Sequence, residues 1–251
     1  MLLGIDHLVI AVRSVEAAAE ILERDLELAV TGGGRHEAMG THNRLAFLGD
    51  TYVELIGVFD AALVRSSTSF AVGNAALRHL EERGEGLATY AIATDDVARY
   101  VERLRAAGSP INEPVAGSRV RPDGEVVRWV CAFPALGPDR PPFLIEHEPA
   151  GAEWGEKARA ARAAFRHAGG GRVRLTALHL PVTDAGRVVD EYGAVLDMSF
   201  DPAWRADIGS QSVVLLSGGG PPIVKLAGGP DTPPLDLVRF GVRWHRVPST
   251  A

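Results

Sequence analysis

Residues 5–26, "IDHLVIAVRSVEAAAEILERDL", join a strand pattern directly to a helix pattern. The first part is rich in β-branched residues, which favour an extended strand. Ser14 follows, and its side-chain oxygen can accept from the free N–H groups of a first helical turn. Beyond it, Val15, Ala18 and Leu22 recur at helical spacing. The stretch therefore predicts a strand that leads into a capped, amphipathic helix.

The same layout recurs twice, as "ATYAIATDDVARYVERLRAAG" at 88–108 and "TALHLPVTDAGRVVDEYGAVL" at 176–196. Asp96 and Asp184 stand in the capping position of Ser14. Short strand-like runs, separated by turn residues, follow each helix pattern. The sequence therefore predicts a protein of the α+β class built from three β-α-β-β-β units.

The spacing of these patterns predicts the domain organisation. Residues 1–150 hold two units, unit one at 1–59 and unit two at 87–150. An Ala/Arg-rich helical linker follows at 151–171. Residues 172–251 hold the third unit and an alternating tail that can add a last strand.

Composition excludes several classes of protein. The chain has 251 residues, 46% of them hydrophobic, and a net charge of −6, which argues against a basic nucleic-acid-binding surface. No apolar run approaches the roughly 20 residues that a membrane span needs. The N-terminus lacks a signal-peptide pattern, and the single cysteine, Cys131, lies in a hydrophobic run as an inert thiol. We therefore expect a cytoplasmic protein that binds neither nucleic acid nor membranes.

Two strand patterns carry a charge in the middle. Glu54 lies within "TYVELIGV" at 51–58, and Glu146 lies within "PFLIEHE" at 142–148. A buried, unpaired carboxylate costs several kcal/mol. Each acid must therefore be paired, protonated or bound to a metal ion.

Four stretches resemble the vicinal oxygen chelate superfamily, also called glyoxalase/bleomycin-resistance/extradiol-dioxygenase, and within it the glyoxalase-like domain group. They are "DHLVIAV" at 6–12, "GGRHEAMGTHNRLAFLGDTYVELI" at 33–56, "GSRVRPDGEVVRW" at 117–129 and "PFLIEHE" at 142–148. The resemblance implies that paired units curl into an incomplete barrel around a cleft. It also implies metal ligands from the first and fourth strands of each of two units.

Carried onto this chain, the resemblance implies a metal site made by His7, Glu54 and Glu146. The fourth ligand place holds Thr89, a poor ligand. One imidazole and two carboxylates suit a divalent ion such as Zn²⁺, Mn²⁺, Fe²⁺, Ni²⁺ or Mg²⁺. In the third unit the corresponding places hold Ala177 and Lys225, so no metal site is expected there.

A metal-free reading stays open, because each acid can instead pair with an arginine on a neighbouring strand. The available partners are Arg44, Arg119, Arg121 and Arg128. Such ion pairs would make a structural or anion-binding site.

Other residues of the two units are candidates for the cleft. His36, His42 and Asn43 lie in a glycine- and histidine-rich loop and could border it, or form a solvated hairpin. A histidine such as His42 can titrate near neutrality, so His42 or Glu146 could serve as general acid or base.

The arginines Arg119, Arg121 and Arg128 are predicted to orient an acidic group of the substrate, the alternative being a solvated basic hairpin.

These features support two hypotheses. The first is a metal-assisted enzyme, of the lyase/isomerase or dioxygenase type, acting on a small oxygenated and anionic substrate. The second is a metal-free protein that binds or sequesters a small molecule, as resistance members of the superfamily do. A third unit without a partner would leave an open barrel edge for the tail or a second chain to cover, which favours a homodimer.

Overall fold

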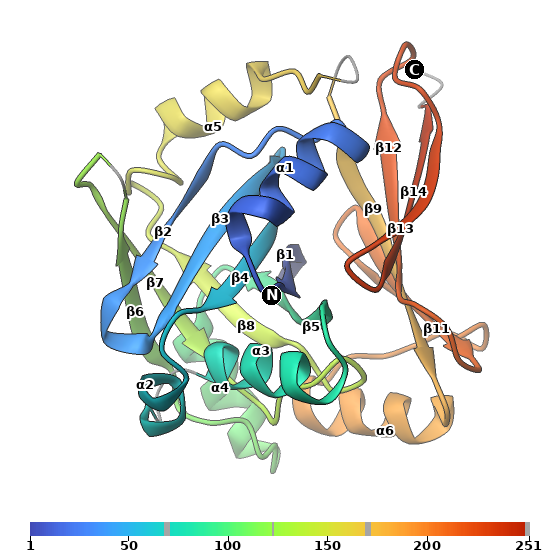
Figure 1. Ribbon diagram of the computed structural model, residues 1–251. Helices are drawn as coiled ribbons and strands as arrows, with labels where there is room; N and C mark the ends of the chain where they lie inside the picture. The colour runs from blue at the N-terminus through green and yellow to red at the C-terminus, as the bar shows by residue number, and fades with distance from the viewer. Residues whose placement is uncertain (68–70, 122, 169–171, 249–251) are drawn as a thin grey trace.

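The computed structural model describes residues 1–67, 71–121, 123–168 and 172–248 (Figure 1). The first unit and its connection contain β1 (Leu2–Ala11), α1 (Val15–Asp25), β2 (Gly32–His36), the short 3₁₀ helix η1 (Glu37–Met39), β3 (Thr41–Leu48), β4 (Thr51–Val58), α2 (Ala61–Ser66) and α3 (Ala71–Glu82). The second unit contains β5 (Gly86–Thr94), α4 (Val97–Ala106), β6 (Val115–Val120), β7 (Val126–Ala132) and β8 (Phe143–His147).

The remaining elements are α5 (Glu156–Ala164), β9 (Arg174–Val182), α6 (Ala185–Leu196), β10 (Arg205–Ile208), β11 (Gln211–Ser217), β12 (Ile223–Gly228), β13 (Leu235–Arg239) and β14 (Val242–Pro248). The predicted α+β class and the tandem units are confirmed. The linker helix lies where it was expected, although 169–171 fall outside the described residues.

The three predicted helix caps are confirmed. Ser14, Asp96 and Asp184 each accept a hydrogen bond from the backbone N–H three residues further along the chain. These bonds satisfy donors that the first helical turn leaves free.

The first two units form a closed barrel in the order β1-β4-β3-β2-β6-β7-β8-β5. β1 and β5 pair antiparallel at the centre, and each pairs in parallel with the last strand of its own unit. On the opposite side β2 meets β6 through one residue pair, Arg35 and Val120. The resemblance implies an incomplete barrel, whereas here the strand pairing closes the barrel. The pairing of β2 with β6 that closes it is a single residue pair.

Two hydrophobic layers follow from the alternation of the strands. Leu8, Leu55 and Tyr90 point outward and pack with helix residues such as Leu22 and Leu104. The inward-facing residues of the same strands make a second, separate cluster inside the barrel, which includes Val9, Ile56, Ala91 and Phe143. The interior of the barrel is therefore mostly apolar, and each polar group within it has to be accounted for.

The second sheet has the order β10-β11-β9-β12-β14-β13. This is the barrel order without β2 and β6, since β9 takes the place of β1 and β12 that of β5. The strand directions agree, because β9 pairs in parallel with β11 and antiparallel with β12, which pairs in parallel with β14. The expectation of a third unit and a tail at 172–251 is thus refined, because β12, β13 and β14 form a fourth unit that lacks a helix.

None of the helices in the described part of the chain is long and apolar enough to cross a membrane.

Candidate functional site

A cavity of about 60 Å³ lies inside the barrel. Its polar lining comes from both units and from the connection that follows β8, and consists of His7, His36, Asn43, Glu54, Arg119, His147 and Glu153. Aromatic and sulfur-bearing side chains, including Tyr52, Trp129, Cys131 and Phe143, complete the wall. Burial, followed by the charges of Asp6 and Glu54, raises the pKa of the Cys131 thiol, which agrees with the inert cysteine expected from the sequence.

Asp6 and His7 form a buried pair at one end of this cavity. Asp6 Oδ1 lies 2.6 Å from His7 Nδ1, and both Asp6 carboxylate oxygens lie 3.0 Å from His147 Nε2. Burial by itself would raise the pKa of Asp6, but the two imidazoles, His147 before His7, hold that pKa below its ordinary value. Asp6 is therefore ionised at neutral pH and accepts the Nδ1–H of His7.

A shift in strand register explains how neighbouring residues can meet in this way. Adjacent side chains on a regular strand point to opposite faces. The pairing of β1 with β5 shifts between Ile5 and His7, which leaves Asp6 as the extra residue of a bulge. Bulges redirect side chains and are frequent beside active sites.

Glu54 faces the other nitrogen of His7, with Oε2 at 3.6 Å from Nε2. If Nδ1 carries the proton donated to Asp6, a neutral His7 presents a lone pair toward a carboxylate oxygen. Two acceptors facing each other in a buried site repel, unless a proton or a bound donor lies between them. The His7–Glu54 pair is therefore built to hold one exchangeable proton or to bind a group that bridges it.

Asn43 positions Glu54, since its Nδ2 donates to Glu54 Oε1 at 2.6 Å. The amide oxygen of Asn43 is buried and has no hydrogen-bond partner within the described residues. An unsatisfied buried acceptor is costly, so a donor supplied by a ligand would be stabilising here.

His36 lies 2.9 Å from Thr41 Oγ1 through Nδ1. Burial lowers the pKa of His36 to about 4, with Glu54 opposing the shift, so this imidazole is neutral at pH 7. Asn43 and His36 thus both line the cavity.

Arg119, also predicted for this site, reaches the cavity from β6. Its Nη1 donates to the carbonyl oxygen of Gly33 at 2.9 Å, and its Nη2 forms an ion pair with Glu153. Trp154, next in sequence, stacks on His147 with ring centroids 4.0 Å apart. The connection after β8 therefore seals one side of the cavity.

The placement of Glu146 in the cleft is a correction. Its Oε2 accepts from the backbone N–H of Val97 at 3.0 Å, at the start of α4, and it does not line the cavity. Strand alternation gives the reason: Phe143, Ile145 and His147 face inward, so Glu146 faces the helix layer. The acid at this position is a helix cap, and the residue after it is the one at the site.

His42, Arg121 and Arg128 also lie outside the cavity. His42 precedes Asn43 on β3, so its side chain points to the opposite face of the strand, where it packs edge-on against Phe59. Burial lowers the pKa of His42. Arg121 forms an ion pair with Asp123, and Arg128 is exposed. These three predicted residues are therefore not gathered with His7 and Glu54.

The donor set does not fit the resident metal site that the resemblance implies. No group of three metal-ligating side chains occurs in the part of the chain that the structure describes. His7 and Glu54 supply two donors, Glu146 is turned away, and Thr89 supplies a hydroxyl, buried and unpartnered within the described residues, at the fourth place. Catalytic metal sites ordinarily have three protein ligands.

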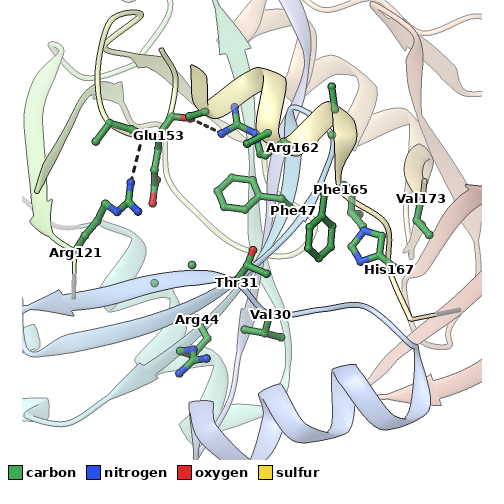
Figure 2. A pocket seen from close by; sticks show the side chains of 18 of the residues that line it. Val30, Thr31, Arg44, Phe47, Arg121, Glu153, Arg162, Phe165, His167 and Val173 are labelled. Carbon is green, nitrogen blue, oxygen red and sulfur yellow. Dashed lines mark hydrogen bonds between the residues drawn. The ribbon is translucent and has the colours of Figure 1, made fainter. Parts of the chain in front are cut away.

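Outside the barrel a wide groove of about 1,770 Å³ runs between β2, β3 and α5 (Figure 2). Phe47 and Arg121 point into the space beneath α5, and Arg162 reaches down from that helix, whereas Arg44 lines the groove from the other side of the strands. Glu153 lines both this groove and the inner cavity, as Asn43 does. The two spaces therefore meet at these residues.

Asp6, His147, Glu153 and Trp154 were missed by the sequence interpretation. Only the bulge brings Asp6 to the site, and no local pattern predicts it. His147 could have been found by counting the pleat from Phe143, which is apolar and inward-facing.

Comparisons with known proteins agree with this architecture. A family model described as "glyoxalase-like domain" matches residues 5–196. A hypothetical protein from Staphylococcus aureus is 16% identical, with a TM-score of 0.79 over 98% of this chain and 99% of that one, which shows a shared fold.

Methylmalonyl-CoA epimerases from Streptomyces coelicolor and Mycobacterium tuberculosis are more distant. They are 22% and 20% identical, cover 58% and 59% of this chain and 97% and 89% of their own, and have TM-scores of 0.42 and 0.43. Scores in this range do not establish a shared fold over the whole molecule. No curated protein matches the sequence significantly.

Proposed function

This chain belongs to the glyoxalase-like domain family, and from that premise we propose that it is an enzyme that moves a proton on a small oxygenated, anionic substrate inside the barrel. The observation that supports this most is the arrangement of His7, Glu54 and Asn43 around one cavity in a mostly apolar interior, with Asp6 bonded to His7. Pairs of titratable groups with different environments are typical of acid–base sites.

In the proposed reaction Glu54 is the general base. Its carboxylate, oriented by Asn43, takes a proton from the carbon next to a carbonyl group of the substrate. When the exchangeable proton of the His7–Glu54 pair lies on Nε2 of His7, this Nε2–H donates a hydrogen bond or its proton to the oxygen on which negative charge develops, while Nδ1–H stays bonded to Asp6. Return of the proton to a neighbouring carbon completes an isomerisation, and loss of a leaving group completes an elimination.

The dioxygenase form of the sequence-based hypothesis is not carried forward. Oxygen activation at non-haem iron ordinarily uses two histidines and one carboxylate around an open coordination position. Here the described cavity offers His7 and Glu54 facing each other, and His147 is engaged with Asp6 and Trp154.

A metal-free binding protein is the second candidate. The outward placement of Glu146 and His42 favours it, since neither residue predicted to move a proton lies in the cavity. A binding protein needs the shape and the hydrogen-bond donors of the site, but no group that exchanges a proton with the ligand.

One experiment distinguishes the two candidates. The protein is incubated in D₂O with a panel of small 2-oxo and 2-hydroxy carboxylates, and deuterium incorporation is followed by NMR. We expect exchange on at least one panel member, and a loss on the order of 100-fold or more in Glu54→Gln, the range typical of general-base removal.

The matched control is Glu146→Gln. It makes the same chemical change on the outer face of β8, away from the cavity, where Glu146 caps α4. Its exchange rate should stay near that of the wild-type protein. Equal losses in both variants would contradict the role of Glu54, and binding without exchange would support the second candidate.

Metal content is a separate test. Protein purified without chelator is analysed for elemental metal, beside Glu54→Gln. Because the described residues offer only two facing donors, we expect less than one metal ion per chain in both. A stoichiometric ion that Glu54→Gln loses would overturn the metal-free form of the proposal.

A further inference from the structure

Residues 148–155 connect β8 to α5, and we call this segment the strap. It places Glu153 inside the protein, where its side chain is 10% exposed and pairs with Arg119, which is 4% exposed. Arg119 is fixed on its other side by the carbonyl oxygen of Gly33. A guanidinium held in this way presents its remaining N–H groups in a fixed direction, which suits a carboxylate.

We propose that Arg119 is the subsite for the carboxylate of the substrate, and that Glu153 occupies this subsite until a ligand displaces it. The proposal rests on the proposed function for the location of the reacting centre, since Arg119 and Glu54 line the same cavity. Glu153 carries the chemical group expected of the ligand, and it comes from a connection rather than from a barrel strand.

The contacts of the strap support displacement. Trp154 Nε1, His147 Nδ1 and Arg162 Nε are buried without hydrogen-bond partners among the residues that the structure describes. Trp154 and His147 stack on each other, and Arg162 lies 4.7 Å above the ring of Trp154. Unsatisfied buried donors and acceptors are rare in a well-formed interior. One of these groups belongs to the strap and two lie against it, so a rearrangement of this wall could satisfy them, at the cost of the hydrogen bonds that Arg121 and Arg162 donate to strap carbonyl oxygens.

Displacement would also open a route to the cavity. The inner cavity of about 60 Å³ holds no more than a very small ligand, whereas the outer groove measures about 1,770 Å³. Glu153 lines both spaces, and Figure 2 places its side chain beside Arg121 at the groove. When Glu153 leaves Arg119, the two spaces become continuous at the carboxylate subsite.

The test is a binding measurement. Calorimetric titration with pyruvate compares the wild-type protein with Glu153→Gln, which removes the competing charge and keeps the shape of the side chain. We expect binding tighter on the order of 10-fold in Glu153→Gln, because the subsite no longer has to be vacated first. Pyruvamide, which lacks the carboxylate, should show no such gain.

Glu156→Gln is the matched control. Glu156 lies three residues after Glu153, its exposed side chain lines the groove, and the substitution removes the same charge. Its affinity for pyruvate should equal that of the wild-type protein. Adding Arg119→Gln to Glu153→Gln should abolish the gain, with circular dichroism confirming that the double variant is folded. An equal gain in Glu156→Gln would assign the effect to general charge and overturn the proposal, as would no gain in Glu153→Gln.

Movement of the strap gives an independent readout. Trp154 is one of four tryptophans, and its stacking on His147 makes its fluorescence sensitive to displacement. We expect pyruvate to change the emission of the wild-type protein more than that of Trp154→Phe, in which Trp129 still lines the cavity. Because binding and fluorescence do not depend on turnover, a failure of deuterium exchange leaves this result separate from that of the proposed function.

Discussion

The barrel and the second sheet share one strand order, but the barrel is closed and the second sheet is open at both ends. Six strands correspond between them in order and direction, while β2 and β6 occur only in the barrel. The face of the second sheet that corresponds to the barrel interior carries Lys225 and His245, 3.1 Å apart, and His179. All three are half-buried at most, whereas His7 and Glu54 are buried.

The difference shows what the two additional strands contribute. Without them a polar sheet face stays in contact with water, where ion pairs contribute little. With them the same face is closed off, and each interaction within it becomes stronger and each unpaired group more costly. Closure, more than the identity of any one side chain, makes the barrel interior the candidate site.

The largest expected effect tests the buried pair of the barrel. Asp6→Asn removes the charge that His7 and His147 share, and breaking a buried pair of this kind costs about 3–5 kcal/mol of unfolding free energy. Urea denaturation at pH 7 measures it.

The control in the second sheet is Asp207→Asn, which breaks the exposed pair with Arg205 and should change the unfolding free energy by less than about 1 kcal/mol. Comparable losses at the two positions would mean that closure does not strengthen the polar contacts of the barrel.

The second prediction concerns pH. The pKa of His36 falls from 6.5 to about 4 on folding, so the unfolded chain binds more protons between these values, and stability falls as pH is lowered through this range. The loss from this residue is about 3 kcal/mol between pH 6.5 and 4, at 1.36 kcal/mol per pKa unit.

His36→Gln should therefore flatten the stability profile of the protein over this range. His179 in the open sheet also has a lowered pKa, caused first by burial and then by Lys225, but the residue is half-exposed. His179→Gln should accordingly flatten the profile less. A larger effect at His179 than at His36 would reverse the comparison.

Sequence periodicity predicted the units, the helix caps and the α+β class, because each depends on residues close together in the chain. The family resemblance, and not periodicity, implied that His7 and Glu54 share one site, with Asn43 and Arg119 as candidates beside it, and all four line the cavity. The number of units was harder, because the fourth lacks the helix that marked the others.

The errors in the site have a common physical cause. Glu146 was placed in the cleft by matching it to Glu54, but the matching was one residue out of step, and one step on a strand reverses the face. Asp6 depends on a bulge, and Glu153 on the path of a connection. Neither leaves a periodic signal in the sequence.

The smallest expected effect tests the closing contact itself. A Cβ added at Gly34 would lie 2.6 Å from the carbonyl oxygen of Val120, so Gly34→Ala pushes β2 away from β6. Overpacking of this kind costs about 1–3 kcal/mol. The control is Gly219→Ala in the connection between β11 and β12 of the second sheet, where an added Cβ meets nothing within 4 Å, so the substitution should be close to neutral. If closure is what isolates the cavity from water, Gly34→Ala should also speed hydrogen exchange at the backbone amides of β2 and β6, while Gly219→Ala leaves them unchanged. If Gly34→Ala loses stability but hydrogen exchange in β2 and β6 is unaltered, the contact between these strands is not what keeps water out of the cavity.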